Sequence, residues 1–167
     1  MAGDILSVCS LMEEMEETMA ELYKEMSHAF SSDEEASALF ARLSREEMGH
    51  KLSIQLERRI IKQNPKIYKG KELSAEVVKQ ATAAAQELKR NLRGLSLREA
   101  VSRVLALEES GAEQHCKGGS DEIPPALGRL LSNLRAGDKA HLEALEAFAK
   151  RRGVDCSSAS KGVEHGK

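Results

Sequence analysis

The feature that most constrains the fold of this chain is a three-and-four spacing of apolar residues, which continues over long stretches with few helix breakers. Such spacing places apolar side chains on one face of an α-helix. Only three of the 167 residues are proline, and the stretches between the apolar positions are rich in the good helix formers Ala, Leu, Glu, Lys and Met. A chain of this length can form one domain with a substantial core. The sequence therefore predicts an all-α domain.

The first half of the chain contains signals for three helices. One is predicted from about residue 4 to residue 30. The next is predicted to begin at a capping box, in which Ser32 accepts a hydrogen bond from a free backbone amide and Glu35 reaches back to the cap. It runs until Pro65, because a helix interior does not tolerate proline. Residues 74–92 predict a shorter helix.

The second half contains signals for two more helices. The third long helix is predicted to begin at a second capping box, Ser96–Glu99, and to end at Gly118–Gly119, because glycine tolerates the left-handed conformation of a helix cap. The last long helix is predicted to enter through Pro124–Pro125 and to end at Gly153.

The lengths of the connections predict how these helices are arranged. Short links join the first two long helices and the last two, so each pair is expected to form an antiparallel hairpin. About 30 residues separate the two pairs, which is enough to cross the bundle. The sequence predicts a four-helix bundle over residues 4–152, with one long crossover that carries the short extra helix. A flexible tail is expected over residues 153–167.

Charge and cysteine content exclude several classes of function. The chain has 25 Lys and Arg against 27 Asp and Glu, so it lacks the surplus of positive charge that would hold nucleic acid or an anionic membrane. It has no run of about 18 apolar residues, and Asp4 stands where a secretory leader would carry basic residues. Cys9, Cys116 and Cys156 are widely separated, which argues against a disulfide framework or a zinc ribbon. We expect a cytoplasmic protein without nucleic-acid or membrane partners.

Acidic residues and histidines interrupt the apolar stripe of every long helix. The second half of the chain repeats the positions of the first half at an offset of 91 to 92 residues. The other acids of these helices, Glu13 and Glu46 among them, are expected to be solvated. The residues that fall on the stripes are Glu16, Glu47, His50, Glu108, Asp138 and His141.

A carboxylate or an imidazole inside a helical bundle is costly unless it is paired or bound to a metal ion. Four carboxylates and two imidazoles could surround two divalent cations, and the carboxylates would neutralise their charge. Oxygen and imidazole ligands suit iron or manganese, and the set offers zinc no thiolate. The alternative is a chance arrangement, because about one residue in five is Asp, Glu or His.

These residues resemble the ligand pattern of the ferritin-like di-iron and di-manganese proteins, in which two helices each supply a Glu and two others each supply Glu-x-x-His. The similarity covers residues 4–152 and is greatest to the rubrerythrin-like branch. It implies a site with two iron ions, or two manganese ions. The resemblance implies that Glu16 and Glu108 are terminal ligands and that Glu47 and Asp138 bridge the two metals. It also implies that His50 and His141 each bind one metal.

The chain also departs from that pattern. Asp138 is one methylene shorter than the glutamate of the family motif, so one metal is expected to bind more weakly. The peroxide-reducing proteins that this chain resembles carry a further glutamate at the position of Gly111. They also carry a four-cysteine rubredoxin module, which this chain lacks. The resemblance implies an oxidoreductase that reduces O₂ or H₂O₂. Because the chain has no rubredoxin module, the electrons are expected to come from an external donor. The alternatives are iron binding and oxidation for storage or delivery in an oligomeric assembly, and a structural bundle with a vestigial site.

Two further polar residues lie one to two turns from the expected terminal carboxylates. Tyr23 and His115 are 92 residues apart and fall on the same stripes. They could orient the ligands or pass protons as catalytic residues outside the ligand set. The alternative is ordinary polar closure of the bundle end.

The second long helix carries a further apolar line on its opposite side. Leu52, Leu56 and Ile60 recur at four-residue spacing and are too apolar for solvent. Either residues 74–92 or a second subunit could cover them. We expect a homodimer or a higher homo-oligomer.

Overall fold

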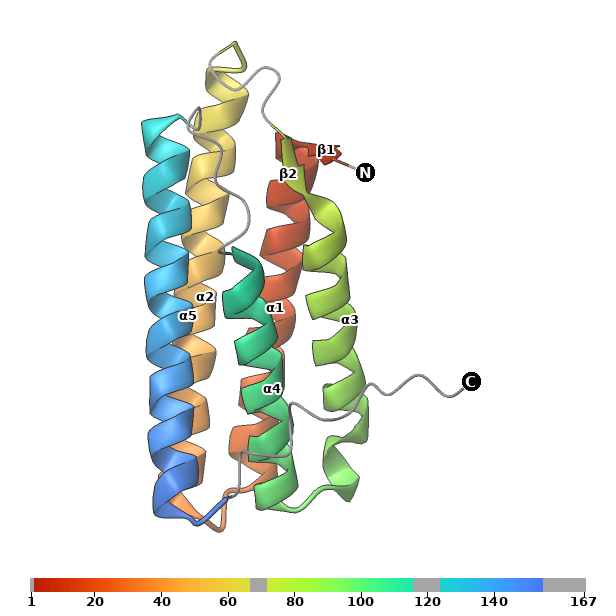
Figure 1. The fold of residues 1–167 in the computed structure, drawn as a ribbon, viewed down its shortest axis with the longest axis vertical. Coiled ribbons are helices and arrows are strands. Elements are labelled where there is room, and N and C mark those ends of the chain that lie inside the picture. The colour runs from red at the N-terminus through yellow and green to blue at the C-terminus, as the bar shows by residue number, and fades with distance from the viewer. Residues whose placement is uncertain (1, 67–71, 116–123, 155–167) are drawn as a thin grey trace.

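The structure is a computed structural model that describes residues 2–66, 72–115 and 124–154. Long helices make up most of this length, and the all-α prediction is confirmed (Figure 1). The helices are α1 (Ile5–Ala29), α2 (Glu34–Gln63), α3 (Ala75–Asn91), α4 (Leu97–His115) and α5 (Pro125–Arg151), with a short 3-10 turn over Leu92–Gly94.

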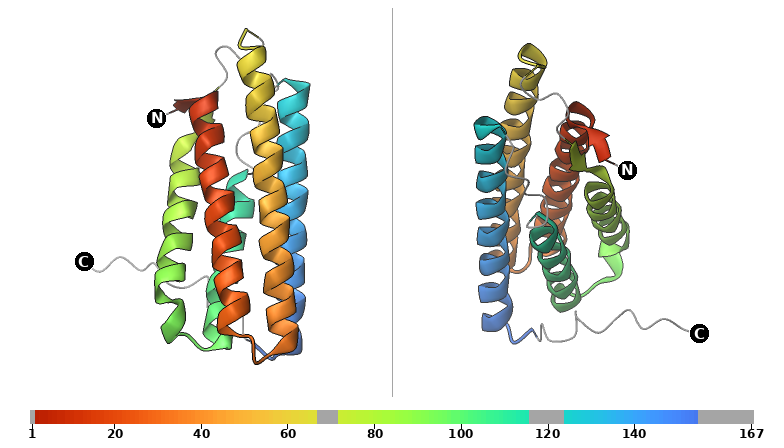
Figure 2. Two further views of the ribbon diagram at one scale, coloured as in Figure 1. Left: turned by 180° about the vertical axis from the view of Figure 1, so that it is seen from behind. Right: turned by 45° about the horizontal axis from the view of Figure 1, so that its top comes forward.

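The helices lie side by side along a common long axis. α1 and α2 form an antiparallel hairpin, and α3 returns the chain along α1 to the end of the bundle where α2 begins (Figures 1 and 2). As a result, α4 runs in the same direction as α2, and α5 then runs back beside α4 and α2. The long connection expected between the two hairpins thus carries α3 along the length of the bundle.

A short strand pair joins the N-terminus to the long connection, and local sequence patterns did not predict it. β1 (Ala2–Asp4) pairs antiparallel with β2 (Glu72–Ser74), with Ala2 opposite Ser74. Asp4 therefore belongs to a strand, and α1 begins one residue later than predicted. The partners are about 70 residues apart in the chain, so only the folded arrangement brings them together.

The N-terminus of α2 differs from the predicted capping box. Asp33, not Ser32, is the cap: its carboxylate accepts a hydrogen bond from the backbone amide of Ala36 at 3.0 Å. Glu35 does not reach back to the cap but pairs with Arg151 and Arg152 at the end of α5, at 2.7 and 3.0 Å. The prediction failed because both Ser32 and Asp33 are good cap residues, and the arginines of α5 compete for Glu35.

The remaining predicted helix ends agree with the structure wherever it describes them. Glu99 and Ser96 exchange hydrogen bonds as a capping box at the start of α4. α5 begins at Pro125 and ends in a Schellman motif, in which Gly153 has a φ of 60° and the amide of Val154 donates to the carbonyl of Ala149 at 2.9 Å.

Parts of two predictions fall outside the described residues. These are the end of the third long helix at Gly118–Gly119 and most of the expected tail, residues 155–167. Within the expected tail, Val154 is described and is buried against the core.

Side-chain hydrogen bonds to backbone carbonyls fix the register of the α1–α2 hairpin. The Ser27 and Ser37 hydroxyls each donate to the other residue's carbonyl, at 2.9 and 3.0 Å. Nearer the middle of the bundle, the Ser44 hydroxyl donates to the carbonyl of Ala20 at 2.8 Å. These bonds fix the position of α1 relative to α2 along the axis of the bundle.

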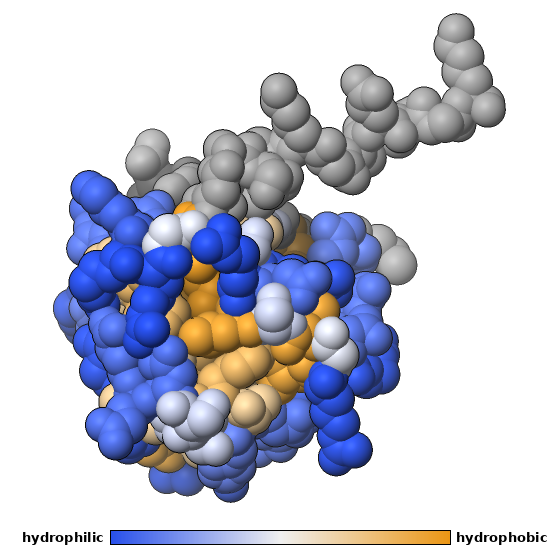
Figure 3. Space-filling view, turned by 90° about the horizontal axis from the view of Figure 1, so that it is seen from below, coloured by the Kyte–Doolittle hydropathy of each residue, from blue (hydrophilic) through white to orange (hydrophobic). Residues whose placement is uncertain are grey.

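The core consists of two apolar clusters with a charged layer between them. Along α1, Met15 belongs to one cluster and Met19 to the other, and the buried Glu16 lies between them. Viewed from the end that carries the α1–α2 turn, apolar side chains gather in the middle and hydrophilic ones surround them (Figure 3). The lower cluster, at this end, includes Leu22, Phe40, Leu43, Leu145 and Phe148. The upper cluster includes Ile5, Cys9, Ile54, Leu127 and Leu134.

The predicted second apolar line on α2 is exposed at two of its three residues, and the third, Ile60, is partly buried. Leu52 and Leu56 are 61% and 60% exposed, and Met48 extends the line by one turn. α3 packs against α1 and α4, so it does not cover this face. In the part of the chain that the structure describes, no helix is both long enough and apolar enough to cross a membrane.

Candidate metal centre

The charged layer brings together side chains from the four long helices. Its members are buried, except that His50 keeps 16% of its side chain exposed. Each helix supplies at least one carboxylate or imidazole at about the same height, between the two apolar clusters. The residues are Glu16 of α1, Glu47 and His50 of α2, Glu108 of α4, and His141 of α5.

Glu16, Glu47 and His50 form the first potential ligand cluster. His50 Nδ1 lies 3.0 Å from Glu47 Oε2 and 3.6 Å from Glu16 Oε2. One turn of α2 separates Glu47 from His50, so their side chains leave the helix on the same side. Three ligand atoms thus converge on a point between α1 and α2.

Glu47, Glu108 and His141 form the second potential ligand cluster. His141 Nδ1 lies 3.1 Å from Glu47 Oε1. The two imidazole rings stack with their centroids 5.3 Å apart and their planes inclined by 27°. The two clusters are therefore adjacent.

Glu47 is the member that the two clusters share. Its Oε2 faces His50, and its Oε1 faces His141. Bridging was predicted for Glu47 and for Asp138, but among the described residues Asp138 belongs to neither cluster. Asp138 instead lines a small cavity of about 40 Å³, here called the inner hollow, together with Glu16, Glu47 and Glu108.

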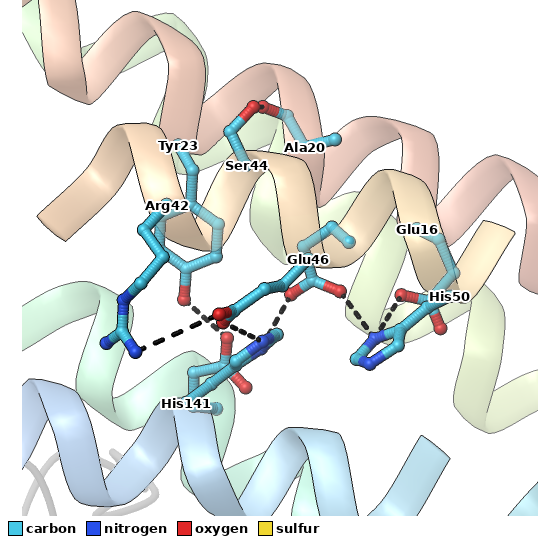
Figure 4. Close-up of polar contacts among 10 residues, drawn as sticks. Glu16, Ala20, Tyr23, Arg42, Ser44, Glu46, His50 and His141 are labelled. Carbon is cyan, nitrogen blue, oxygen red and sulfur yellow. Dashed lines mark hydrogen bonds and ion pairs between the residues drawn. The ribbon is translucent and has the colours of Figure 1, made fainter. Parts of the chain in front are cut away.

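Glu46 is a contact of this site that the sequence analysis missed. It was expected to be solvated, and 41% of its side chain is exposed, yet its Oε2 lies 3.1 Å from His141 Nε2 (Figure 4). Arg42 lies one turn earlier, 3.8 Å from the other oxygen of Glu46. A proton on Nε2, donated to Glu46, leaves the Nδ1 lone pair of His141 free to bind a metal. Glu13, also expected to be solvated, is mostly buried and pairs with Arg58 at 3.2 Å.

Gly137 provides the space in which the ring of His50 lies. A Cβ atom at this position of α5 would lie 2.3 Å from His50 Nε2 and 2.5 Å from its Cε1. Any side chain here would displace the ring. The backbone of α5 at Gly137 therefore packs directly against the His50 ring, one turn before His141.

Tyr23 contacts the second cluster directly. It is fully buried in α1, and its hydroxyl donates a hydrogen bond to Glu108 Oε1. Burial, followed by the negative charge of Glu108, raises the pKa of Tyr23, so the hydroxyl keeps its proton. His115 is the last residue of α4, and its side chain lies outside what the structure describes.

The acids of the layer differ in their affinity for protons. Burial raises the pKa of Glu47, but the contacts of its carboxylate with the imidazoles of His141 and His50 outweigh it and lower the pKa to about 2. Burial raises the pKa of Glu16, and burial with the charge of Glu47 raises that of Glu108 to about 8. Burial opposes the charge of His50, yet its hydrogen bonds with Glu16 and Glu47 raise its pKa to about 10. Burial therefore favours the protonated form of Glu16 and of Glu108, which lie one in each cluster.

Two buried polar atoms of the layer lack a hydrogen-bond partner among the described residues. They are Glu16 Oε1 and His141 Nδ1, one in each cluster, and His141 Nδ1 keeps only an ion-pair contact of 3.1 Å with Glu47 Oε1. Buried polar atoms are normally satisfied, so each such exception requires an explanation. A cation in each cluster would provide it, because carboxylates and imidazoles are common metal ligands. The residues present could therefore hold a metal ion in each cluster.

A scan against protein-family models, a search of curated proteins and a search of solved structures each found no match to this chain.

Proposed function

We propose that this chain is a ferritin-like di-iron carboxylate protein, with manganese as the alternative metal, and that it is an oxidoreductase acting on O₂ or H₂O₂. The observation that carries the proposal is the position of Glu47. Its two oxygens face two different histidines, at 3.0 and 3.1 Å, and each histidine has a further buried carboxylate in its cluster. A carboxylate held in this way can bridge two metal ions.

The course of the chain supports the ferritin-like part of the proposal. α3 brings the chain back along the bundle, so α4 runs parallel to α2, and the two hairpins face one another. Each of the four long helices then contributes to one layer. This is the arrangement in which helical bundles build dinuclear carboxylate sites.

The side chains of the layer would have distinct roles. Glu47 would hold both ions, while Glu16 and Glu108 would each hold one. Glu46 orients His141 through Nε2, and the backbone at Gly137 seats His50. The apolar clusters on both sides exclude bulk water, which strengthens the electrostatic interactions within the layer.

Two ferrous ions would supply electrons for the reduction of O₂ or H₂O₂. The chain's own contribution includes a proton held close to the site, because the Tyr23 hydroxyl donates to the carboxylate of Glu108. Burial, followed by the charge of Glu108, raises the pKa of this hydroxyl, so Tyr23 keeps the proton. An external donor would supply the electrons for this reduction.

Anaerobic titration with Fe(II), measured as bound metal per chain, tests the proposal. We expect about two ions per chain, followed by ferric absorption when H₂O₂ is added. Many ions per chain in a large particle would instead indicate iron storage. No binding, with a melting temperature that Fe(II) and Mn(II) leave unchanged, would leave only a structural bundle.

Isosteric variants separate the two clusters. Glu16→Gln should weaken only the first ion and Glu108→Gln only the second, whereas Glu47→Gln should weaken both because the clusters share it. Glu17→Gln is the matched control, because this neighbour of Glu16 has a half-exposed side chain paired with Lys51. Equal losses of bound metal in all three ligand variants would contradict the assignment of Glu47 as the one residue that the two clusters share.

A further inference from the structure

A second and larger cavity lies between α3 and α4. It has a volume of about 420 Å³ and is here called the outer cavity. This volume is within the range of small-molecule sites, about 300 to 1,000 Å³. Its walls include the small side chains of Ala81 and Ala84, together with the polar side chains of Glu87, Arg103 and Ser110.

The outer cavity and the inner hollow share part of their walls. Leu107 of α4 and Ala81 of α3 line both. Both residues are partly buried, and the wall that they share between the two spaces is here called the partition. On the far side of this partition lie the carboxylates of Glu16, Glu47 and Glu108.

The inner hollow lies on the carboxylate side of the charged layer. The two imidazoles come from α2 and α5 and stack on one another, and among the described residues that line the hollow none is a histidine. The hollow is lined from α1, α2, α3, α4 and α5 and has room for about three molecules the size of water. A small reactant that entered it would meet the carboxylates and any metal ion they hold.

We infer that the outer cavity is the route by which a small neutral reactant reaches the proposed metal centre, and that Leu107 and Ala81 form the partition it passes. The inference rests on the proposed function, because it concerns access to that site. A rotation of the Leu107 side chain would join the two spaces, and side-chain rotations of this kind are fast compared with turnover. A neutral molecule such as O₂ or H₂O₂ can pass an apolar partition, whereas an ion must first lose its hydration.

Nitric oxide is a suitable probe, because it is small, neutral and binds ferrous iron without turnover. The full-length protein is loaded with Fe(II) under anaerobic conditions, and the rate of nitric oxide binding is followed by stopped-flow absorbance. Ala84→Trp fills the outer cavity, and we expect it to slow binding by at least about tenfold while the bound iron is unchanged. Ala83→Trp is the matched control, because its neighbouring position on α3 is exposed and lies outside the cavity wall.

Leu107→Ala provides a test in the opposite direction. It opens the partition, so nitric oxide should bind faster than in the unaltered protein, and this result does not depend on whether Ala84→Trp folds. Equal rates in all variants that bind iron would overturn the inference and leave the proposed function standing. Failure of the unaltered protein to bind iron would overturn both.

Discussion

At the scale of single residues, Gly137 shows how one missing side chain can make room for an imidazole ring. Glycine inside a helix normally costs about 0.5–1 kcal/mol relative to alanine. Here a Cβ would lie 2.3 Å from His50 Nε2, so the glycine avoids a clash with a proposed ligand. We expect Gly137→Ala to turn the His50 ring away from Glu47 and to reduce bound Fe(II) from about two ions per chain to about one.

Gly128→Ala is the control for this substitution. Gly128 lies in the same helix, and a Cβ there would have no atom within 4 Å. This variant should bind iron normally and gain about 0.5–1 kcal/mol of stability in thermal unfolding. If both alanine variants bind iron alike, Gly137 does not position His50.

The contact of Glu46 with His141 leads to a second prediction about a single residue. Its contact with His141 Nε2 fixes which nitrogen of the imidazole faces Glu47. Partners of this kind typically contribute about 10–100-fold to metal affinity. Glu46→Gln should therefore weaken binding of the ion in the second cluster by that factor, measured by competition with a chelator. Glu143→Gln, an exposed acid of α5 paired with Lys139, should leave the affinity unchanged.

The sequence predicted the inward-facing members of the site better than their supports. Glu16, Glu47 and His50 interrupt apolar stripes, so helical periodicity alone places them inside. Glu46 is rotated by one residue from Glu47 towards the edge of α2, and its contact depends on how closely α5 crosses there. The role of Gly137 depends on the same close approach. Neither contact can be inferred from the sequence of a single helix.

At the scale of helices, the N-terminus of α2 has two adjacent residues that could cap it, Ser32 and Asp33, and substitutions can show which of them stabilises the helix. Asp33→Ala should cost about 1 kcal/mol, because the amide of Ala36 loses its acceptor. For a chain of this size, that corresponds to a fall of about 2–4 °C in melting temperature. Ser32→Ala should have no measurable effect, since Ser32 is not the cap.

Asp33→Asn distinguishes capping from ion pairing. Asp33 also accepts a hydrogen bond from Arg152 at 2.7 Å, and asparagine keeps the cap while it removes the charge. Exposed ion pairs contribute little to stability, so this variant should melt close to the unaltered protein. A loss equal to that of Asp33→Ala would assign the stability to the ion pair with α5 instead.

Local chemistry thus predicts helices and many of their ends, but not pairings between distant segments. Proline and glycine marked the limits of α5, and the Ser96 capping box marked the start of α4. The β1–β2 pair joins residues about 70 positions apart, and the ion pairs of Glu35 cross from α2 to α5. Such contacts depend on the relative positions of whole helices, which a local pattern does not contain.

At the scale of the whole molecule, the burial of charge and the exposure of apolar surface are two separate features. The charged layer is enclosed within one chain, and α3 closes the side formed by α1 and α4. The opposite face, along α2, retains Met48, Leu52 and Leu56 in one exposed line. A two-fold axis beside α2 would bury the same line from both copies, as in an isologous dimer.

We therefore expect the protein to form a homodimer through α2, with twice the chain mass of 18.3 kDa in light scattering. The double substitution Leu52→Glu and Leu56→Glu should shift it to a monomer, because like charges would then face one another across the axis. Both positions are exposed, so the bundle itself should keep its melting temperature and its capacity for iron. Ala83→Glu, on α3, adds charge away from this face and should leave the dimer intact. A monomeric unaltered protein would show that the line on α2 is simply solvent-exposed.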